Sequence, residues 1–272
     1  MKFFILLSCI LSTGYAQDSY VILPWRTSPF QPLKMYTWNG TAPKTGRNYT
    51  GHYGIIQDQS LFRFELPSGG CVNRTNVTVS SKMFGCEVAT NGGFFSFSGS
   101  CEGNTVINST VVTWTNQNRS VFGVLPNKTT VVGYIASSST LPFVSLLSGL
   151  GYLVNNGVNY VNQAREFLPN ASKSSFVTEK APRTAIGITK QNELALIVVD
   201  GVEVLGLGID LFEFADILIE AVDIQYAINL DGGGSSDMVY NHQIYSRPTC
   251  SDQLFPICER PVTSFTCISY AA

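Results

Sequence analysis

A glycine-rich run in the last fifth of the chain joins backbone freedom to polar side chains. The run reads Asn229-Leu230-Asp231-Gly232-Gly233-Gly234-Ser235-Ser236. Consecutive glycines let a backbone approach a ligand closely. Their N–H groups form a concave binding place for an anion, and the two serine hydroxyls add donors. Asp231 would offer a carboxylate at the rim of this place. A flexible glycine–serine loop is the alternative interpretation.

A second segment combines an amide, two glycines and two aromatic rings. It reads Asn91-Gly92-Gly93-Phe94-Phe95. The amide of Asn91 supplies two donors and an acceptor for sugar hydroxyls, and an aromatic face suits the C–H side of a sugar ring. A hairpin turn of the Asn-Gly type, with aromatic core residues behind it, explains the same residues.

A third segment places an arginine before a predicted strand. Arg183 follows Pro182 and precedes Thr184, and its planar fork suits a phosphate or a carboxylate. A solvated surface charge is the alternative interpretation. The two chain histidines, His52 and His242, lie in no nucleophile or metal motif, which argues against a Ser-His-Asp triad and against a zinc-protease site.

Two further carboxylates are candidates for acid/base chemistry. Asp200 comes directly after an apolar run and precedes Gly201. The Asp-Gly pair also occurs as a hairpin turn, so both interpretations stand. Glu213 is a weaker third candidate, because its position in a predicted helix equally suits a surface charge.

The elements that must position these residues differ between the two halves of the chain. From residue 20 to about 165, runs rich in Val, Ile, Thr and aromatic residues predict strands at 77–80, 106–114, 122–125 and 129–135. Residues 126–128 predict a turn between the last two strands.

The C-terminal half predicts a crossover unit. Residues 184–189, 194–199 and 225–230 are expected as strands, the second of them buried. Between the last two, apolar residues recur at helical spacing after Asp210, which suits an N-cap. We therefore expect an α+β fold with a mixed, mostly antiparallel central sheet and few helices.

The first sixteen residues have the pattern of a secretory signal peptide. Lys2 precedes an apolar run that is too short to span a bilayer, and small residues follow it. The expected product is residues 17–272, one disulfide-bonded domain without a membrane anchor. We expect it to be secreted or luminal in the secretory pathway, with the lysosome as one destination.

Cysteine number agrees with an oxidising compartment. With Cys9 removed in the leader, six cysteines are left to form three bridges, namely Cys71, Cys86, Cys101, Cys250, Cys258 and Cys267. Three lie in each half of the chain, so an odd number of bridges must join the halves if all six pair internally. The pairing itself stays open. No C-x-x-C pair occurs, so we expect no zinc site and no other metal.

Glycosylation sequons are frequent before residue 175. They begin at Asn39, Asn48, Asn73, Asn76, Asn108, Asn118, Asn127 and Asn170. Charged residues make up only 13% of the chain, and the net charge is −2. Without a basic cluster, neither nucleic acid nor an anionic membrane surface is an expected partner. The sequence carries no signal for an oligomeric state.

Taken together, these segments resemble the phosphodiester glycosidase family. The resemblance runs in order from about residue 69 to 269 and is weaker before it. Its anchors are Gly69-Gly70-Cys71, Asn91 to Phe95, Cys101 with Gly103-Asn104, Phe143-Val144, Leu147-Ser148-Gly149, Arg183 to Gly187, Asp200-Gly201, Ala227 to Ser235, and the last three cysteines with Arg260-Pro261-Val262.

The resemblance implies an activity and roles for the motif residues. It implies hydrolysis of the sugar–phosphate glycosidic bond of a sugar 1-phosphodiester, with release of GlcNAc from GlcNAc-1-phospho-6-mannose and exposure of mannose 6-phosphate. No cofactor is implied. Another glycan or exopolysaccharide phosphodiester, or non-catalytic glycan binding, are the alternatives.

The implied roles divide the segments between the two halves of the substrate. Arg183, Thr184 and residues 232–236 would hold the phosphate, and Asn91 with Gly92 and Gly93 would shape the sugar pocket beside Asn229. Asp231 and Asp200 are the acidic candidates for the oxocarbenium-like centre.

Overall fold

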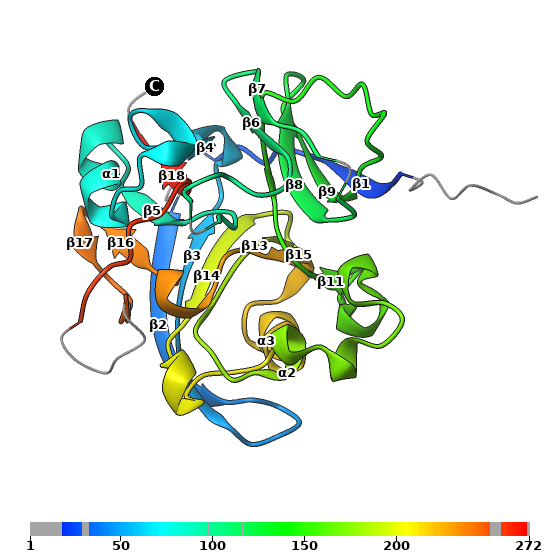
Figure 1. Cartoon of the computed structure of the whole chain (residues 1–272), viewed down its shortest axis with the longest axis vertical. Helices are drawn as coiled ribbons and strands as arrows, with labels where there is room; N and C mark the ends of the chain where they lie inside the picture. The colour runs from blue at the N-terminus through cyan, green and yellow to red at the C-terminus, as the bar shows by residue number, and fades with distance from the viewer. Residues whose placement is uncertain (1–17, 29–32, 97, 116, 251–256, 271–272) are drawn as a thin grey trace, which may run out of the picture.

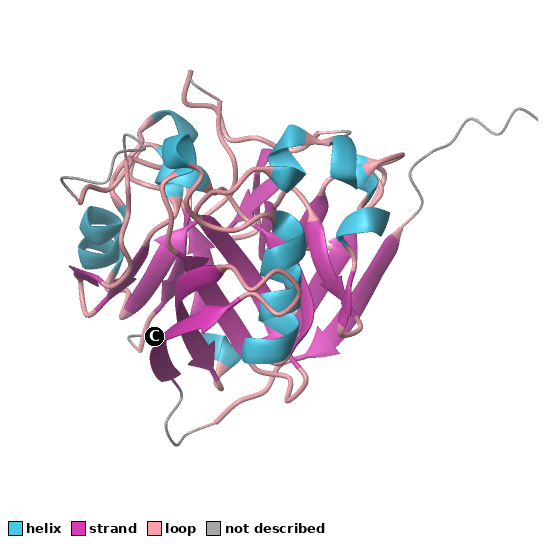
Figure 2. Ribbon diagram, turned by 90° about the horizontal axis from the view of Figure 1, so that it is seen from below, coloured by secondary structure: helices cyan, strands magenta, loops and turns pink. Residues whose placement is uncertain are grey.

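The computed structural model describes residues 18–28, 33–96, 98–115, 117–250 and 257–270. The predicted signal peptide lies outside these described residues. Within them, strands predominate and form three sheets, with few helices beside them (Figures 1 and 2).

The first sheet has six strands, and its order is β1-β9-β8-β10-β6-β7. Its strands are β1 (Ser19–Pro24), β9 (Thr129–Tyr134), β8 (Ser120–Leu125), β10 (Ser145–Ser148), β6 (Thr105–Ile107) and β7 (Thr110–Thr113). The predicted turn at 126–128 joins β8 to β9, and the φ of Lys128 there is 59°.

The second sheet has seven strands and holds most of the motif residues. Its order is β12 (Val158–Asn159), β11 (Tyr152–Asn155), β15 (Ile224–Asn229), β13 (Arg183–Thr189), β14 (Leu194–Val199), β3 (Asn48–Ile56) and β2 (Leu33–Thr41). The third sheet has five strands in the order β17 (Gln243–Ile244), β16 (Met238–Tyr240), β5 (Val88–Asn91), β18 (Phe265–Ile268) and β4 (Phe62–Glu65).

The predicted crossover unit is confirmed. Both β14 and β15 pair with β13 in antiparallel register, so they run parallel to each other on either side of it. Helix α3 (Leu211–Ala221) connects them and packs on β11 and β15. Asp210 caps the helix and forms a capping box with Glu213. Two further helices are α1 (Val77–Phe84) and α2 (Ser175–Thr178).

The α+β class and the antiparallel pairing are confirmed, but three predictions are corrected. Residues 77–80 begin helix α1, not a strand. Val77, Ser80 and Ser81 bury one helical face against the third sheet, and this packing outweighs the β-branched composition. The strand expected at 106–114 is a hairpin that turns at Asn108 and Ser109, both with positive φ.

The third wrong prediction is a single central sheet. The strands divide into three sheets instead. One apolar cluster nevertheless contains residues of all three sheets, including Phe64, Phe122 and Ile186. Two smaller clusters lie beside it, one between α1 and the third sheet and one on the first sheet. Local patterns predict strands but do not say which strands pair.

All six expected cysteines form bridges. The pairs are Cys71–Cys101, Cys86–Cys267 and Cys250–Cys258. Cys86–Cys267 is the predicted bridge between the two halves of the chain. Of the eight sequon asparagines, Asn76 is half-buried at the N-cap of α1 and the others are exposed. Glycan occupancy stays a prediction. Among the described residues, every helix is too short or too polar to cross a membrane.

The bridges differ in the length of chain that they close, which leads to a first prediction. Cys86–Cys267 spans 181 residues and Cys250–Cys258 spans 8. Chain entropy assigns about 5 kcal/mol to the long loop and about 2.5 kcal/mol to the short one. Replacing Cys86 and Cys267 together by Ser should therefore cost more stability in urea unfolding than replacing Cys250 and Cys258. Equal losses would contradict the entropic account.

Candidate functional site

The side chain of Asn91 joins the three motif segments. Its Nδ2 donates to the carbonyl oxygen of Asp231 at 2.7 Å. Its Oδ1 accepts from the Thr184 hydroxyl at 2.8 Å and from the backbone N–H of Asp237 at 3.1 Å. Asn91 and Thr184 are fully buried. The amide is therefore engaged within the protein and connects the ends of β5, β13 and β15.

Backbone hydrogen bonds complete this junction. The N–H of Asp231 donates to the carbonyl of Gly92, and the N–H of Leu230 donates to that of Thr184. The N–H of Gly233 donates to the carbonyl of Pro182. The motifs that sequence analysis singled out separately are thus neighbours in space, as the family resemblance implied.

Two of the glycines are constrained, Gly92 by close packing and Gly233 by its backbone conformation. A Cβ on Gly92 would lie 2.6–2.9 Å from Ser264. Gly233 has a φ of +57°, a left-handed conformation that favours glycine. The N–H of Gly93 donates to the Ser264 hydroxyl at 2.9 Å, which fixes the backbone at that glycine. The glycine run is therefore a packed turn, not a flexible linker.

Asp231 has the most chemically informative surroundings in this junction. Burial raises the pKa of its carboxyl to about 6, although a hydrogen bond from Ser235, the charge of Arg260 and the Gly232 N–H act in the opposite direction. The nearby charge of Glu102 raises the pKa further. A carboxyl with a pKa near neutrality can change its charge under physiological conditions.

Arg260 comes to this site from the C-terminal segment. Its Nη1 lies 3.5 Å from the Ser235 hydroxyl, and its Nε donates to the carbonyl of Cys250 at 3.1 Å. The guanidinium thus stands beside the loop that carries Asp231. In the sequence, Arg260 stands out only as an anchor of the family resemblance, because no local pattern distinguishes it from a surface arginine.

Arg183 packs next to Gly232 of the loop and is 1% exposed. Its Nε donates to the Ile209 carbonyl, and its Nη2 donates to the carbonyls of Phe176 and Glu179. Burial lowers its pKa to about 10, so it stays charged at neutral pH. The surface-charge interpretation of Arg183 is wrong. The guanidinium holds several segments around the site.

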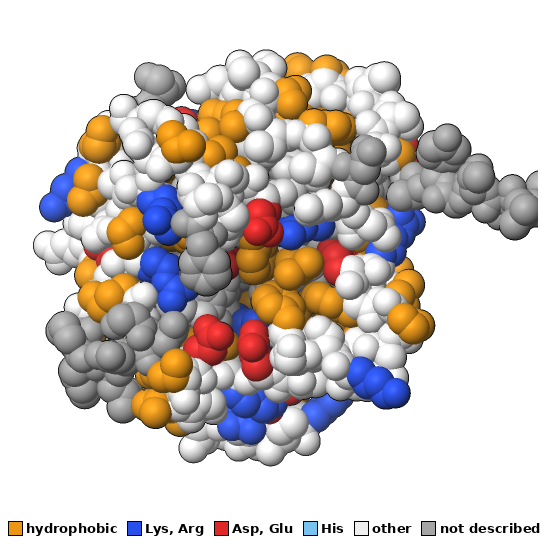
Figure 3. Space-filling model, in the orientation of Figure 1, with side chains coloured by type: hydrophobic (Ala, Val, Ile, Leu, Met, Phe, Trp, Pro, Cys, Tyr) orange, Lys and Arg blue, Asp and Glu red, His pale blue; other side chains and the backbone are white. Residues whose placement is uncertain are grey.

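Aromatic and charged side chains border the same region. The rings of Phe94 and Phe176 lie 5.8 Å apart, edge to face. Arg119 stands over Phe94 at 5.8 Å and donates to Glu102 at 2.7 Å. Figure 3 shows a hollow in the middle of the face seen in Figure 1, with charged side chains at its border and apolar ones on its floor.

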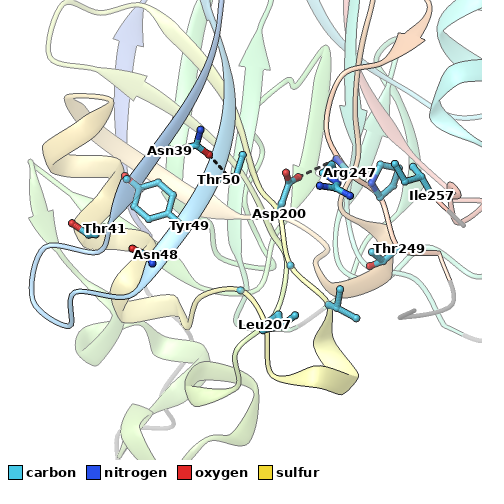
Figure 4. A pocket seen from close by; sticks show the side chains of 15 residues that line it. Asn39, Thr41, Asn48, Tyr49, Thr50, Asp200, Leu207, Arg247, Thr249 and Ile257 are labelled. Atoms are coloured by element: carbon cyan, nitrogen blue, oxygen red, sulfur yellow. Dashed lines mark hydrogen bonds between the residues drawn. The ribbon is translucent and has the colours of Figure 1, made fainter. Parts of the chain in front are cut away.

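Asp200 lies at a different cavity. Its Oδ2 is 2.9 Å from His52 Nε2, and its Oδ1 accepts from the backbone N–H of Arg247. His52 Nδ1 in turn contacts the Thr37 hydroxyl at 3.0 Å. The cavity has a volume of about 660 Å³, and Asn39 and Tyr49 lie on its opposite wall (Figure 4). The lining residues include neither Asn91 nor Asp231.

The other predicted residues have structural contacts. Glu213 is buried and accepts from Lys180, Thr45, Arg47 and the Asp210 N–H. Burial acts to raise the pKa of Glu213, but the hydrogen bonds from Lys180, Thr45 and the Asp210 N–H, together with the charge of Lys180, lower it below its ordinary value. Asn229 is buried and donates to the Leu150 carbonyl. Ser236 and Gly234 are buried in the turn that follows Asp231. No cluster of three or more metal-binding side chains occurs among the described residues.

Comparison with known proteins places this geometry in a family. The family model described as phosphodiester glycosidase matches residues 84–269. N-acetylglucosamine-1-phosphodiester alpha-N-acetylglucosaminidase of Mus musculus is 36% identical over 96% of this chain and 58% of its own length. The Homo sapiens protein of that name is 38% identical over 74% of this chain and 41% of its own length. The chain thus spans about half the length of these curated relatives.

Comparison with solved structures points to the same family. The catalytic domain of the zebrafish protein of that name superposes with a TM-score of 0.81 at 28% identity, over 93% of this chain and 88% of that domain. A hypothetical protein from Synechocystis has a TM-score of 0.68 at 14% identity over 87% of this chain and 62% of its own, which shows a shared fold alone. The chain belongs to the phosphodiester glycosidase family.

Proposed function

We propose that this protein hydrolyses the sugar–phosphate glycosidic bond of a sugar 1-phosphodiester. The observation that carries the proposal is that the Ser235 hydroxyl, which hydrogen-bonds the Asp231 carboxyl, also contacts the Arg260 guanidinium, whose charge acts on that carboxyl. Family membership and the names of the relatives support a GlcNAc 1-phosphodiester as the substrate, and the family resemblance implies GlcNAc-1-phospho-6-mannose. The product on the other side of the bond would then be mannose 6-phosphate.

The two charges suit the two halves of such a reaction. When the bond between the anomeric carbon and oxygen breaks, positive charge develops on the sugar and negative charge on the departing phosphate. A carboxylate stabilises the first and a guanidinium the second. A phosphate monoester leaves more easily than an alkoxide, because its second pKa is about 6. A strong general acid is therefore less necessary here than for an ordinary glycoside.

We assign to Asp231, in its ionised form, the role of facing the anomeric carbon. The charge of Arg260 favours that form. Asn91 and Arg183 have their polar atoms engaged with the protein, and we assign both a positioning role. Asp200 contacts His52 and a separate cavity, and a catalytic role for it rests on the family resemblance alone.

The cellular location that we propose rests on the sequence and on the disulfide bonds. The leader, the sequons and three disulfides support passage through the secretory pathway. We propose a secreted or luminal enzyme, possessing N-linked glycans of its own, that acts on phosphorylated glycans in lysosomal targeting.

The direct test is an assay on purified protein with GlcNAc-1-phospho-6-mannose. We expect release of GlcNAc, measured by chromatography, and about a 10²–10⁴-fold lower kcat for Asp231→Asn, since that change removes the ionisable group but keeps its size. Glu220→Gln, on the exposed part of α3, is a matched control that should retain full activity. Sugar binding without turnover on any phosphodiester would favour a glycan-binding protein.

The raised pKa of Asp231 predicts the pH dependence of this activity. Because the ionised carboxyl is the active form, kcat/KM should rise with pH through about 6 and level off above it. Arg260→Gln removes a charge that lowers the pKa of Asp231, so the midpoint should move to higher pH as well as the plateau falling. A profile that declines through pH 6, or an unmoved midpoint in the variant, would refute the assignment.

The positioning role of Asn91 predicts a loss of stability. Asn91→Ala leaves the Thr184 hydroxyl, the Asp231 carbonyl and the Asp237 N–H without their partner in a buried place. We expect a cost of about 2–4 kcal/mol in the free energy of unfolding. Asn162→Ala, at an exposed position, should change it by no more than about 0.5 kcal/mol. Similar stabilities for the two variants would contradict the role.

A further inference from the structure

A second cavity, of about 590 Å³, lies next to the Asp231 site. Its walls include Ser68, Asn73, Arg74, Thr75 and Arg260. The described residues that line it contain two arginines and no acid. Its volume lies in the range that small-molecule sites occupy. Its charge and the hydroxyl groups of Ser68 and Thr75 suit an anionic, hydroxyl-rich ligand.

Hydrogen bonds connect this cavity to the catalytic region. Arg260 lines the cavity and also reaches the Ser235 hydroxyl at 3.5 Å. Thr75 forms a bridge with Val262 through two backbone hydrogen bonds of 3.0 Å each. Two residues beyond that bridge, the Ser264 hydroxyl accepts from the Gly93 N–H. The wall of the cavity and the glycine segment beside Asp231 therefore belong to one hydrogen-bonded unit.

The second arginine of that wall stands over an aromatic ring. Arg74 is exposed, and its guanidinium carbon lies 5.6 Å from the centre of the Phe95 ring. A cation held over an aromatic face keeps its N–H groups available at the ring's edge. The adjacent Phe94 belongs to the aromatic border of the Asp231 site. The 94–95 segment thus places one ring at the site and the other under Arg74.

The proposed reaction creates charge on the side of the bond where these arginines lie. Water adds its oxygen to the anomeric carbon, and the bonding electron pair stays on the phosphate oxygen. The diester has one negative charge, and the phosphomonoester gains a second above a pKa of about 6. The proton lost by the water is released to solvent. Two guanidinium groups match a dianion better than one does.

We propose that the cavity between Arg74 and Arg260 is the subsite for the phosphate-bearing half of the substrate, and that Arg74 sets its preference for a phosphorylated sugar. This inference rests on the proposed function. Arg260 contacts the scissile phosphate at the border of the cavity. Arg74 supplies the second positive charge, and the polar groups of Ser68 and Thr75 face the hydroxyls of the departing sugar.

The test measures binding of the two products, so that it does not depend on turnover. Mannose 6-phosphate and GlcNAc are titrated separately into the protein, and their dissociation constants are obtained by ligand-observed NMR. Arg74→Ala should raise the Kd of mannose 6-phosphate about tenfold, as expected for a charge-assisted hydrogen bond. The Kd of GlcNAc should stay unchanged. Arg74→Lys should recover part of the affinity.

Two features of the design isolate Arg74. Because Arg74 is the middle residue of the Asn73 sequon, every protein is made in an Asn73→Gln background, so that glycan occupancy there is the same. Arg247→Ala is the matched control, since Arg247 is an exposed arginine that lines the cavity at Asp200. It should leave both dissociation constants unchanged.

The outcomes separate this inference from the proposed function. An unchanged Kd for mannose 6-phosphate in Arg74→Ala, an equal rise for GlcNAc, or a rise in Arg247→Ala alone would overturn the subsite. Specific loss of mannose 6-phosphate binding in a protein that hydrolyses no phosphodiester would support the subsite and reject the proposed activity. Specific loss of mannose 6-phosphate binding in Arg74→Ala, together with phosphodiester hydrolysis by the wild-type protein, would support both the subsite and the proposed activity.

Discussion

The arrangement of the site depends on one buried amide. Asn91 receives a hydrogen bond from the end of β13, donates one to the carbonyl of Asp231, and receives another from Asp237. These partners lie 93, 140 and 146 residues away in sequence. A buried amide with every one of these partners in place is stable, whereas a partly satisfied one is costly. This requirement brings β5, β13 and the glycine turn after β15 together.

The junction has a direct consequence for electrostatics. It holds the Asp231 carboxyl where burial raises its pKa, with Arg260 close enough to oppose that rise. Arg183, with nearly all of its surface buried, donates to the carbonyls of Ile209, Phe176 and Glu179 and holds them in place. The two arginines thus have different roles. Arg183 supports the loop, and Arg260 faces the proposed leaving group. Gly92 permits this proximity, because a Cβ there would collide with the backbone of Ser264.

Local sequence patterns predicted the parts of the fold that local physics determines. The crossover around α3 followed from helical spacing after Asp210, and the turn at Lys128 from its punctuating residues. Helix α1 was missed because its β-branched residues favour a strand until the third sheet covers one face. The division into three sheets depends on pairings between distant strands, such as β3 with β14, which no short window contains.

The residues of the site likewise divide into those that a local sequence pattern reveals and those that distant segments bring together. The motif segments were visible because glycines, an amide and an aspartate stood at the ends of predicted strands. Arg260, Glu102 and Phe176 were not, because each reaches the site from a distant segment without a pattern of its own. The state of Arg183 was equally hidden. An arginine before a strand looks the same in sequence whether it faces solvent or lies buried among carbonyls.

The central claim is that Asp231 faces the anomeric carbon while Arg260 faces the phosphate. A crystal structure with both products, GlcNAc and mannose 6-phosphate, tests it most directly. The account predicts the anomeric carbon within about 3–3.5 Å of an Asp231 carboxylate oxygen and the phosphate in contact with Arg260. It predicts no ligand atom in contact with the guanidinium of Arg183. Products bound instead beside Asp200, in the cavity that Tyr49 and Arg247 line, would contradict it.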